Sequence, residues 1–158
     1  MHKKGLAMIQ NILIVDDQFE MRRLLRVSLE DNKRILHEAN TGDDAWRIVQ
    51  HLRPCLILLD VMFPGFLDGY QVCKRIKTHS ILKHQTRVIL MSGLSRSNDV
   101  ERGMAAECDA YLIKPFTQLI LMDAVERVLE GQYDKLPVGD PSRSYSKEMH
   151  PQGGMLLS

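Results

Sequence analysis

The sequence contains only three cysteines, and no two of them have the Cys-x-x-Cys spacing: Cys55, Cys73 and Cys108. An odd, scattered set indicates neither a disulfide framework nor a zinc site. The chain also lacks an apolar run of the roughly 18 residues that a membrane-spanning helix needs. Its N-terminus lacks the apolar stretch of a signal peptide. We therefore expect a cytoplasmic protein with no membrane partner.

An excess of charge of either sign is absent as well. Lys and Arg number 21 and Asp and Glu number 20, which gives a formal net charge of +1. Proteins that bind nucleic acid or a membrane surface through charge are usually more basic, so we expect no direct binding to nucleic acid. The 158 residues suffice for one domain whose core needs no disulfide and no structural metal.

Short apolar runs alternate along the chain with amphipathic stretches of about 10–15 residues. This alternation predicts an α/β fold with a mostly parallel sheet and helices on both faces. The strand at 35–39 is the least apolar and is expected at an edge. The predicted strands are 11–15, 35–39, 55–60, 87–91 and 109–113, and the predicted helices are 18–31, 42–52, 69–79, 96–106 and 116–130.

The ends of the predicted elements carry recognisable signals. Thr41 suits the N-cap of the second helix, and Gly131 suits the end of the last one. After Gly131 the composition turns to Pro, Gly, Ser and charged residues. We expect an N-terminal extension at 1–10, one domain at 11–130 and a flexible tail at 131–158 that is too short for an output domain. Its apolar end, Met155-Leu156-Leu157, is a candidate to dock on a surface.

Polar side chains follow four of the predicted strands: Asp16 and Asp17, Asp60, Ser92, and Lys114. The carboxyl ends of parallel strands share one edge of a sheet, so we expect these groups to converge. Two carboxylates near 4 Å repel by about 4 kcal/mol at an effective dielectric constant near 20, and a cation such as Mg²⁺ relieves this repulsion. Lysine and serine suit phosphoryl oxygens, and an aspartate can accept a phosphoryl group.

These residues stand in motifs that resemble the receiver domain of two-component response regulators. The resemblance covers 11–130 and implies a flavodoxin-like, doubly wound, five-stranded parallel sheet, (βα)5, with strand order 2-1-3-4-5. The motifs that carry it are Ile12-Leu13-Ile14-Val15-Asp16-Asp17, Leu58-Leu59-Asp60-Val61-Met62, Ser92-Gly93 after Val88-Ile89-Leu90-Met91, and Lys114-Pro115-Phe116.

The resemblance also implies a metal site and a site of phosphorylation. Asp60 would be the phosphorylated residue and a metal ligand, with Mg²⁺ as the cofactor and Mn²⁺ as a possible substitute. Asp17 would bind the metal directly, with Asp16 assisting. The backbone carbonyl of Met62 would supply a further ligand.

The same resemblance assigns roles at the fourth and fifth strands. Ser92 and Lys114 would bind the phosphoryl group, and Lys114-Pro115 would be a cis peptide bond. Ser92 and Tyr111 would form the conformational switch, although Tyr111 fits a structural tyrosine equally well.

The expected function is that of a stand-alone receiver. A histidine kinase or histidine phosphotransfer protein would phosphorylate Asp60, and the switched surface would bind a downstream protein partner. One alternative is a receiver fragment of a larger regulator. Another is an aspartyl-phosphate hydrolase-type enzyme, which would need a second Asp where Met62 stands. A third, a flavodoxin-like binding module, would need a phosphate-cradling loop in place of the acidic sequence that follows Val15.

The sequence departs from the family pattern beside Asp60. The stretch between Pro64 and Asp68-Gly69 holds three residues where the family usually has two, and it is unusually apolar. Met62 and Leu94 are apolar neighbours of the site, which predicts slow self-dephosphorylation.

Two helices have surfaces with alternative uses. The basic group Arg22, Arg23 and Arg26 fits either docking of the phosphodonor or a plain solvated face. On the last helix the apolar residues span an arc of about 200°, wider than one sheet face needs. Leu119, Met122 and Leu129 fall outside the core stripe, so this helix is expected to meet a second copy, another protein or the chain's own tail.

Overall fold

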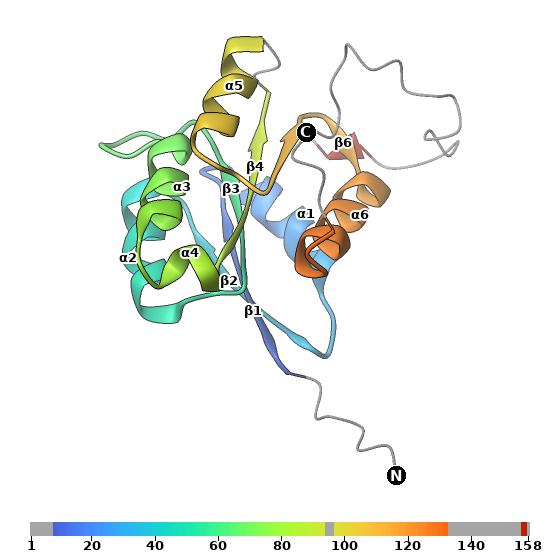
Figure 1. Cartoon of the computed structure of the whole chain (residues 1–158). Helices are drawn as coiled ribbons and strands as arrows, with labels where there is room; N and C mark the ends of the chain where they lie inside the picture. The colour runs from blue at the N-terminus through green and yellow to red at the C-terminus, as the bar shows by residue number, and fades with distance from the viewer. Residues whose placement is uncertain (1–7, 94–96, 133–155, 158) are drawn as a thin grey trace.

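Five parallel strands form the central sheet of the computed structural model, which describes residues 8–93, 97–132 and 156–157 (Figure 1). Their order across the sheet is β2-β1-β3-β4-β5. This confirms the predicted flavodoxin-like fold and the place of β2 at an edge. The strands are β1 (Gln10–Val15), β2 (Arg34–Ala39), β3 (Leu56–Asp60), β4 (Arg87–Ser92) and β5 (Ala110–Ile113).

Helices cover both faces of the sheet. Figure 1 shows α2, α3 and α5 on one side and α1 and α6 on the other. Five of the helices correspond to predicted ones, whereas α4 has only four residues, too few to show a helical period in the sequence. They are α1 (Phe19–Leu29), α2 (Gly42–Leu52), α3 (Gly69–Thr78), α4 (Leu82–Gln85), α5 (Ser97–Ala105) and α6 (Gln118–Leu129).

The three central strands, β1, β3 and β4, each contain an uninterrupted apolar run because both of their faces are buried there. In β1, Leu13 and Val15 pack on the side of α2 and α3, while Ile12 and Ile14 pack on the side of α1 and α6. The other central strands alternate in the same way, so two apolar clusters sandwich the sheet. This rigid double core fixes the position of every strand end, where the polar groups lie.

Local signals set the helix ends as predicted. The Asp44 N–H donates to Thr41 Oγ1 (3.1 Å) at the start of α2. Gly131, just after α6, has a φ of +72°, a value that glycine adopts without strain. At the start of α3, Asp68 and Gln71 form a reciprocal capping box that the sequence analysis did not single out.

The last helix begins later than predicted, because Phe116–Thr117 form a short strand, β6. Its leftover apolar surface is smaller than expected. Met122 and Leu129 pack against the core, and Leu119 is 59% exposed. Leu156–Leu157 form β7, which pairs antiparallel with β6, so part of the predicted apolar tail end contacts the domain. Residues 1–7, 133–155 and 158 lie outside the described residues, and with them most of the predicted extension and tail.

Among the described residues, no helix has the length and apolar character needed to cross a membrane. The three cysteines are free; Cys73 and Cys108 are buried.

The contact between α3 and the end of β3 requires glycine at position 69. A Cβ atom there would overlap the Asp60 carbonyl oxygen and lie 2.7 Å from the Val61 Cα. We therefore expect Gly69→Ala to lower the free energy of unfolding by about 1–3 kcal/mol through overpacking. Gly93→Ala is the matched control, since a Cβ at Gly93 meets nothing within 4 Å. Urea unfolding measures both, and equal stability of the two variants would contradict the expectation.

Candidate functional site

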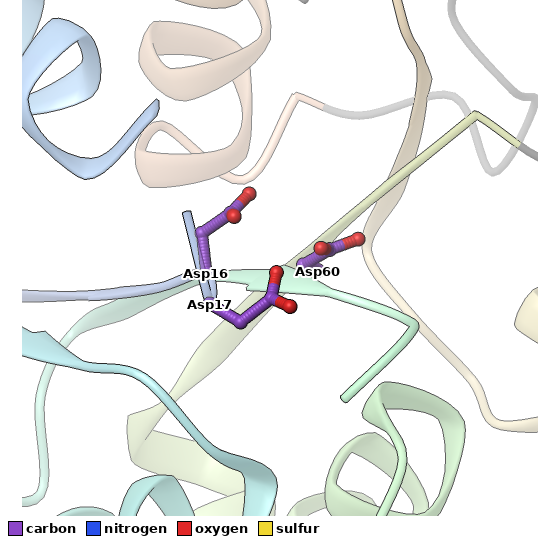
Figure 2. A group of neighbouring side chains, drawn as sticks. All are labelled: Asp16, Asp17 and Asp60. Atoms are coloured by element: carbon purple, nitrogen blue, oxygen red, sulfur yellow. The ribbon is translucent and has the colours of Figure 1, made fainter. Parts of the chain in front are cut away.

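Three carboxylates meet at the carboxyl edge of the sheet, as predicted. Asp16 and Asp17 follow β1, and Asp60 ends β3 (Figure 2). One oxygen atom from each carboxylate lies within 4.8 Å of the other two. Figure 2 shows the Asp17 side chain extending toward Asp60. The geometry brings together the three carboxylates among the metal ligands that the sequence analysis proposed, whereas the role of the Met62 carbonyl stays a prediction.

Asp16 is fully buried, and both of its carboxylate oxygens accept hydrogen bonds. Oδ1 accepts from the Gln18 N–H (2.9 Å), and Oδ2 accepts from Lys114 Nζ (2.9 Å). The Asp16 carbonyl oxygen also accepts a bond from Arg22 Nη1 (2.9 Å). These contacts fix Asp16 in place, so it has less freedom than Asp17 to bind a metal directly.

Asp17 has the opposite environment. It is exposed, and no side chain or backbone N–H among the described residues forms a hydrogen bond or ion pair with its carboxylate. Both of its oxygens therefore face water in the neighbourhood of Asp16 and Asp60. A carboxylate of this kind is suited to direct coordination of a cation.

Asp60 is 8% exposed and sits between a backbone donor and a cation. Its Oδ1 accepts from the Val61 N–H (2.8 Å), and its Oδ2 lies 3.7 Å from Lys114 Nζ. Burial raises the pKa of Asp60 to about 6; Asp16 and Asp17 also raise it, while Lys114 and the Val61 N–H lower it. Desolvation and like charge together disfavour the carboxylate form when no metal is bound.

Lys114 follows β5, the edge strand opposite β2, and its side chain extends to the carboxylates. Its side chain is 14% exposed, and its backbone N–H donates to the Ser92 carbonyl oxygen (2.7 Å). The Lys114–Pro115 peptide bond is cis, the form that the resemblance implies. Strands β4 and β5 thus place the ammonium group directly beside Asp60.

Ser92 lies on β4 and Tyr111 on β5, and their side chains have different surroundings. Ser92 is the last residue of β4, fully buried, and one residue beyond Met91, which pairs with Asp60. Tyr111 is 1% exposed, and its hydroxyl lies 3.0 Å from that of Tyr70 on α3. The structure therefore brings Ser92 to the edge beside Asp60, whereas the described hydroxyl contact of Tyr111 is with a helix. Tyr70 was missed because nothing in its local sequence marks it.

The longer apolar loop after Asp60 is ordered by α2. The Phe66 N–H donates to Asp43 Oδ2 (3.2 Å), and Gly65 has a φ of +111°, which favours glycine. Phe63 packs against the core, but the side chains of Met62 and Phe66 are 62% and 92% exposed. The lengthened loop therefore presents the aromatic ring of Phe66 to solvent, while Asp43 holds its backbone.

The basic group on α1 separates into two kinds of residue. Arg22 and Arg26 form ion pairs with Glu38 of β2, at 3.2 and 2.7 Å, whereas Arg23 is exposed. Two of the three arginines thus tie α1 to the edge strand. A plain solvated face therefore does not describe Arg22 and Arg26, whereas docking of the phosphodonor stays a prediction.

The titration of Asp60 generates a prediction for metal-free protein. Between about pH 4 and pH 6 the folded state binds more protons than the unfolded state, so stability falls as pH rises and the penalty is complete above about pH 6. In chelator, Asp60→Asn should raise the free energy of unfolding by about 1–3 kcal/mol at pH 7.5, and by much less at pH 4.5.

Urea unfolding at the two pH values measures this gain. Glu20→Gln, which removes an exposed acid from the first turn of α1, is the control and should show no comparable gain. Equal effects of Asp60→Asn at both pH values would show that burial of the charged form is not the cause.

Known proteins share this arrangement. The response regulator receiver domain family matches residues 12–126. The transcriptional regulatory protein SrrA of Staphylococcus aureus is 34% identical over 110 residues, which are 70% of this chain and 44% of SrrA. The chain thus matches less than half the length of that curated relative.

Two solved receiver domains have the same fold. The BeF3-activated receiver domain of DrrB, a Thermotoga maritima protein, is 32% identical with a TM-score of 0.69, covering 78% of this chain and 99% of its own. The receiver domain of a signal transduction histidine kinase from Syntrophus aciditrophicus is 30% identical with a TM-score of 0.70, covering 82% and 98%. With the matched family and the sheet order, these likenesses show that the chain belongs to the response regulator receiver domain family of two-component signalling.

Proposed function

We propose that the protein accepts a phosphoryl group on Asp60 in a reaction that requires Mg²⁺. The observation that carries this proposal is the cluster of Asp16, Asp17 and Asp60, whose ligand atoms lie within 4.8 Å, with Lys114 Nζ 3.7 Å from Asp60. A divalent cation would relieve the repulsion that remains among three carboxylates held so close, and a lysine beside them suits a phosphoryl oxygen. No other group of three or more His, Cys, Asp or Glu side chains with this geometry occurs among the described residues.

The donor set fits a hard divalent cation. Asp17 would bind it directly, because its carboxylate is exposed and has no other partner among the described residues. Asp60 and the Met62 carbonyl would contribute further oxygens, and Asp16 would assist. All of these ligands are oxygens, as Mg²⁺ prefers, and Mn²⁺ would be accepted by the same set. When bound, the metal neutralises charge that would otherwise repel the incoming phosphoryl group.

The transfer uses the chain's own groups. A carboxylate oxygen of Asp60 attacks the phosphorus of a phosphohistidine, the new O–P bond forms, and the P–N bond breaks with its electron pair remaining on the imidazole. Lys114 and the Ser92 hydroxyl stabilise the phosphoryl oxygens. Lys114 then exchanges part of its contact with Asp16, 2.9 Å away, for the phosphoryl group.

The phosphodonor would be a histidine kinase or a histidine phosphotransfer protein. Since Arg22 and Arg26 are paired with Glu38, donor docking on α1 would rely on its exposed residues. Besides Glu20, three of these recur every four positions: Phe19, Arg23 and Val27. Such a spacing places them on one side of the helix. The reaction would take place in the cytoplasm.

The switched state would be read by a downstream protein, without direct contact with nucleic acid. Phosphorylation would draw Ser92 toward the phosphoryl group and shift the population of the face around Tyr111, near β5 and α6. A second copy of the chain at α6 is a further candidate partner, although Leu119 is the one large apolar side chain of α6 that is exposed. The receiver would act alone or as part of a longer regulator, and the shorter match to SrrA favours testing both.

Mass spectrometry after incubation with acetyl phosphate tests the proposal. With Mg²⁺, the wild type should gain one phosphoryl group, and the gain should disappear in EDTA and in Asp60→Asn. Asp17→Asn should need at least tenfold more Mg²⁺, because one direct ligand is lost. Glu20→Gln, an exposed acid outside the cluster, should behave as wild type. A wild type without a Mg²⁺-dependent adduct would disprove the proposal.

Met62 bears on how long the phosphoryl group would last. Its side chain is 62% exposed and apolar, so it would offer no hydrogen bond to a water that attacks the phosphoaspartate. We therefore expect a slow loss of the phosphoryl group, and a roughly tenfold faster loss in Met62→Asn, since one new hydrogen bond in the transition state is worth about that factor. Met62→Leu is the control.

Decay of the mass adduct after removal of acetyl phosphate gives both rates. Equal rates for Met62→Asn and Met62→Leu would show that the side chain at this position does not control hydrolysis. Sustained release of inorganic phosphate at many turnovers per second by the wild type would instead favour a hydrolase.

A further inference from the structure

Tyr111 is tied to α3 by a hydrogen bond between two tyrosines. The hydroxyl groups of Tyr70 and Tyr111 lie 3.0 Å apart, and both residues are buried, at 5% and 1% exposure. Buried hydroxyl groups are costly when they lack a partner, so each tyrosine favours the buried position of the other. The position of Tyr111 is therefore set in part by a residue 41 positions earlier in the chain.

Helix α5 packs against this pair of tyrosines. The Arg102 guanidinium lies 4.3 Å from the centre of the Tyr70 ring and 3.5 Å from Asp68. One residue further on, Gly103 makes room for Tyr111, because a Cβ atom there would lie 2.7 Å from its Cδ2. Helix α5 therefore packs against both rings, Tyr70 through Arg102 and Tyr111 at Gly103.

The first turn of α3, which contains Tyr70, also contacts the backbone of Asp60. The Gly69 N–H donates to the Val61 carbonyl oxygen (2.9 Å), and a Cβ atom at Gly69 would overlap the Asp60 carbonyl oxygen. Tyr70 is the next residue. A displacement of the Asp60 backbone would therefore shift the backbone at Gly69 and Tyr70 directly. This connection does not involve Ser92.

We propose that Tyr70 is a positioning residue, which holds Tyr111 in its buried position and couples that position to Asp60 through the first turn of α3. The inference rests on the proposed phosphorylation of Asp60, and it adds a second connection between that residue and the surface formed by α5 and β5. In the structure, the buried Tyr111 coexists with the assembled cluster of carboxylates and Lys114. Tyr70 thus favours the arrangement that binds the phosphoryl group.

Two measurements on Tyr70→Phe test the inference, because this variant keeps the ring and loses only the hydroxyl. The first is the nuclear Overhauser cross-peak between the Tyr111 ring and Gly103 Hα, which should weaken as Tyr111 leaves its site. The second is the affinity for beryllofluoride with Mg²⁺, which should fall by up to about fivefold, the factor that one net hydrogen bond supplies.

The partner substitution provides the matched control. Tyr111→Phe removes the same bond from the other side and should weaken beryllofluoride binding by a similar factor, and the double variant should lose no more than either single one. A Tyr70 of purely structural importance would instead lower the stability of the fold and leave the affinity of the folded protein for beryllofluoride unchanged. Additive losses, an unchanged cross-peak or an unchanged affinity in Tyr70→Phe would each overturn the inference.

The same experiment separates this inference from the proposed function. If wild-type protein with Mg²⁺ does not bind beryllofluoride at all, phosphoryl acceptance on Asp60 is disproved. The cross-peak in Tyr70→Phe then still decides whether Tyr70 positions Tyr111. If the wild type binds and the variant is indistinguishable from it, only the role of Tyr70 is disproved.

Discussion

The contact of the Lys114 ammonium group with two carboxylates is the interaction on which the whole sheet edge depends. Lys114 follows β5, whereas Asp16 follows β1, and two strands lie between them in the sheet. At 2.9 Å from Asp16 and 3.7 Å from Asp60, the cation offsets repulsion that the buried setting strengthens. The Lys114 ammonium group therefore connects the end of β5 to the ends of β1 and β3. Any anion that draws Lys114 toward Asp60 must therefore alter contacts on both β1 and β5.

Much of this arrangement could be predicted from the sequence because it follows from buried strands. Runs such as the one that ends at Asp60 are apolar on both faces, and this pattern specifies a parallel sheet covered by helices. Once the sheet is parallel, the residues after its strands must gather at one edge. The convergence of Asp16, Asp17, Asp60 and Lys114 needed no further information.

The contacts between distant helices and strands could not be predicted. Nothing near Tyr70 in the sequence indicates Tyr111 as its partner, and nothing near Arg22 indicates Glu38 on β2. Such pairs depend on the rotation and tilt of each helix, which hydrophobic periodicity defines only to within a residue or so. The apolar arc of α6 was overestimated for the same reason, since neighbouring elements cover Met122. Side-chain pairing is decided by packing, and packing is not local.

The ordered loop after Asp60 has a thermodynamic consequence. Asp43 and Gly65 hold the backbone around Phe66, yet the ring itself is 92% exposed and contributes almost nothing to folding stability. The entropy of ordering this segment is already spent in the free protein. Any molecule that covers Phe66 would therefore gain its full apolar area with little further loss of chain freedom. Calorimetry would record that event as a negative change in heat capacity on association.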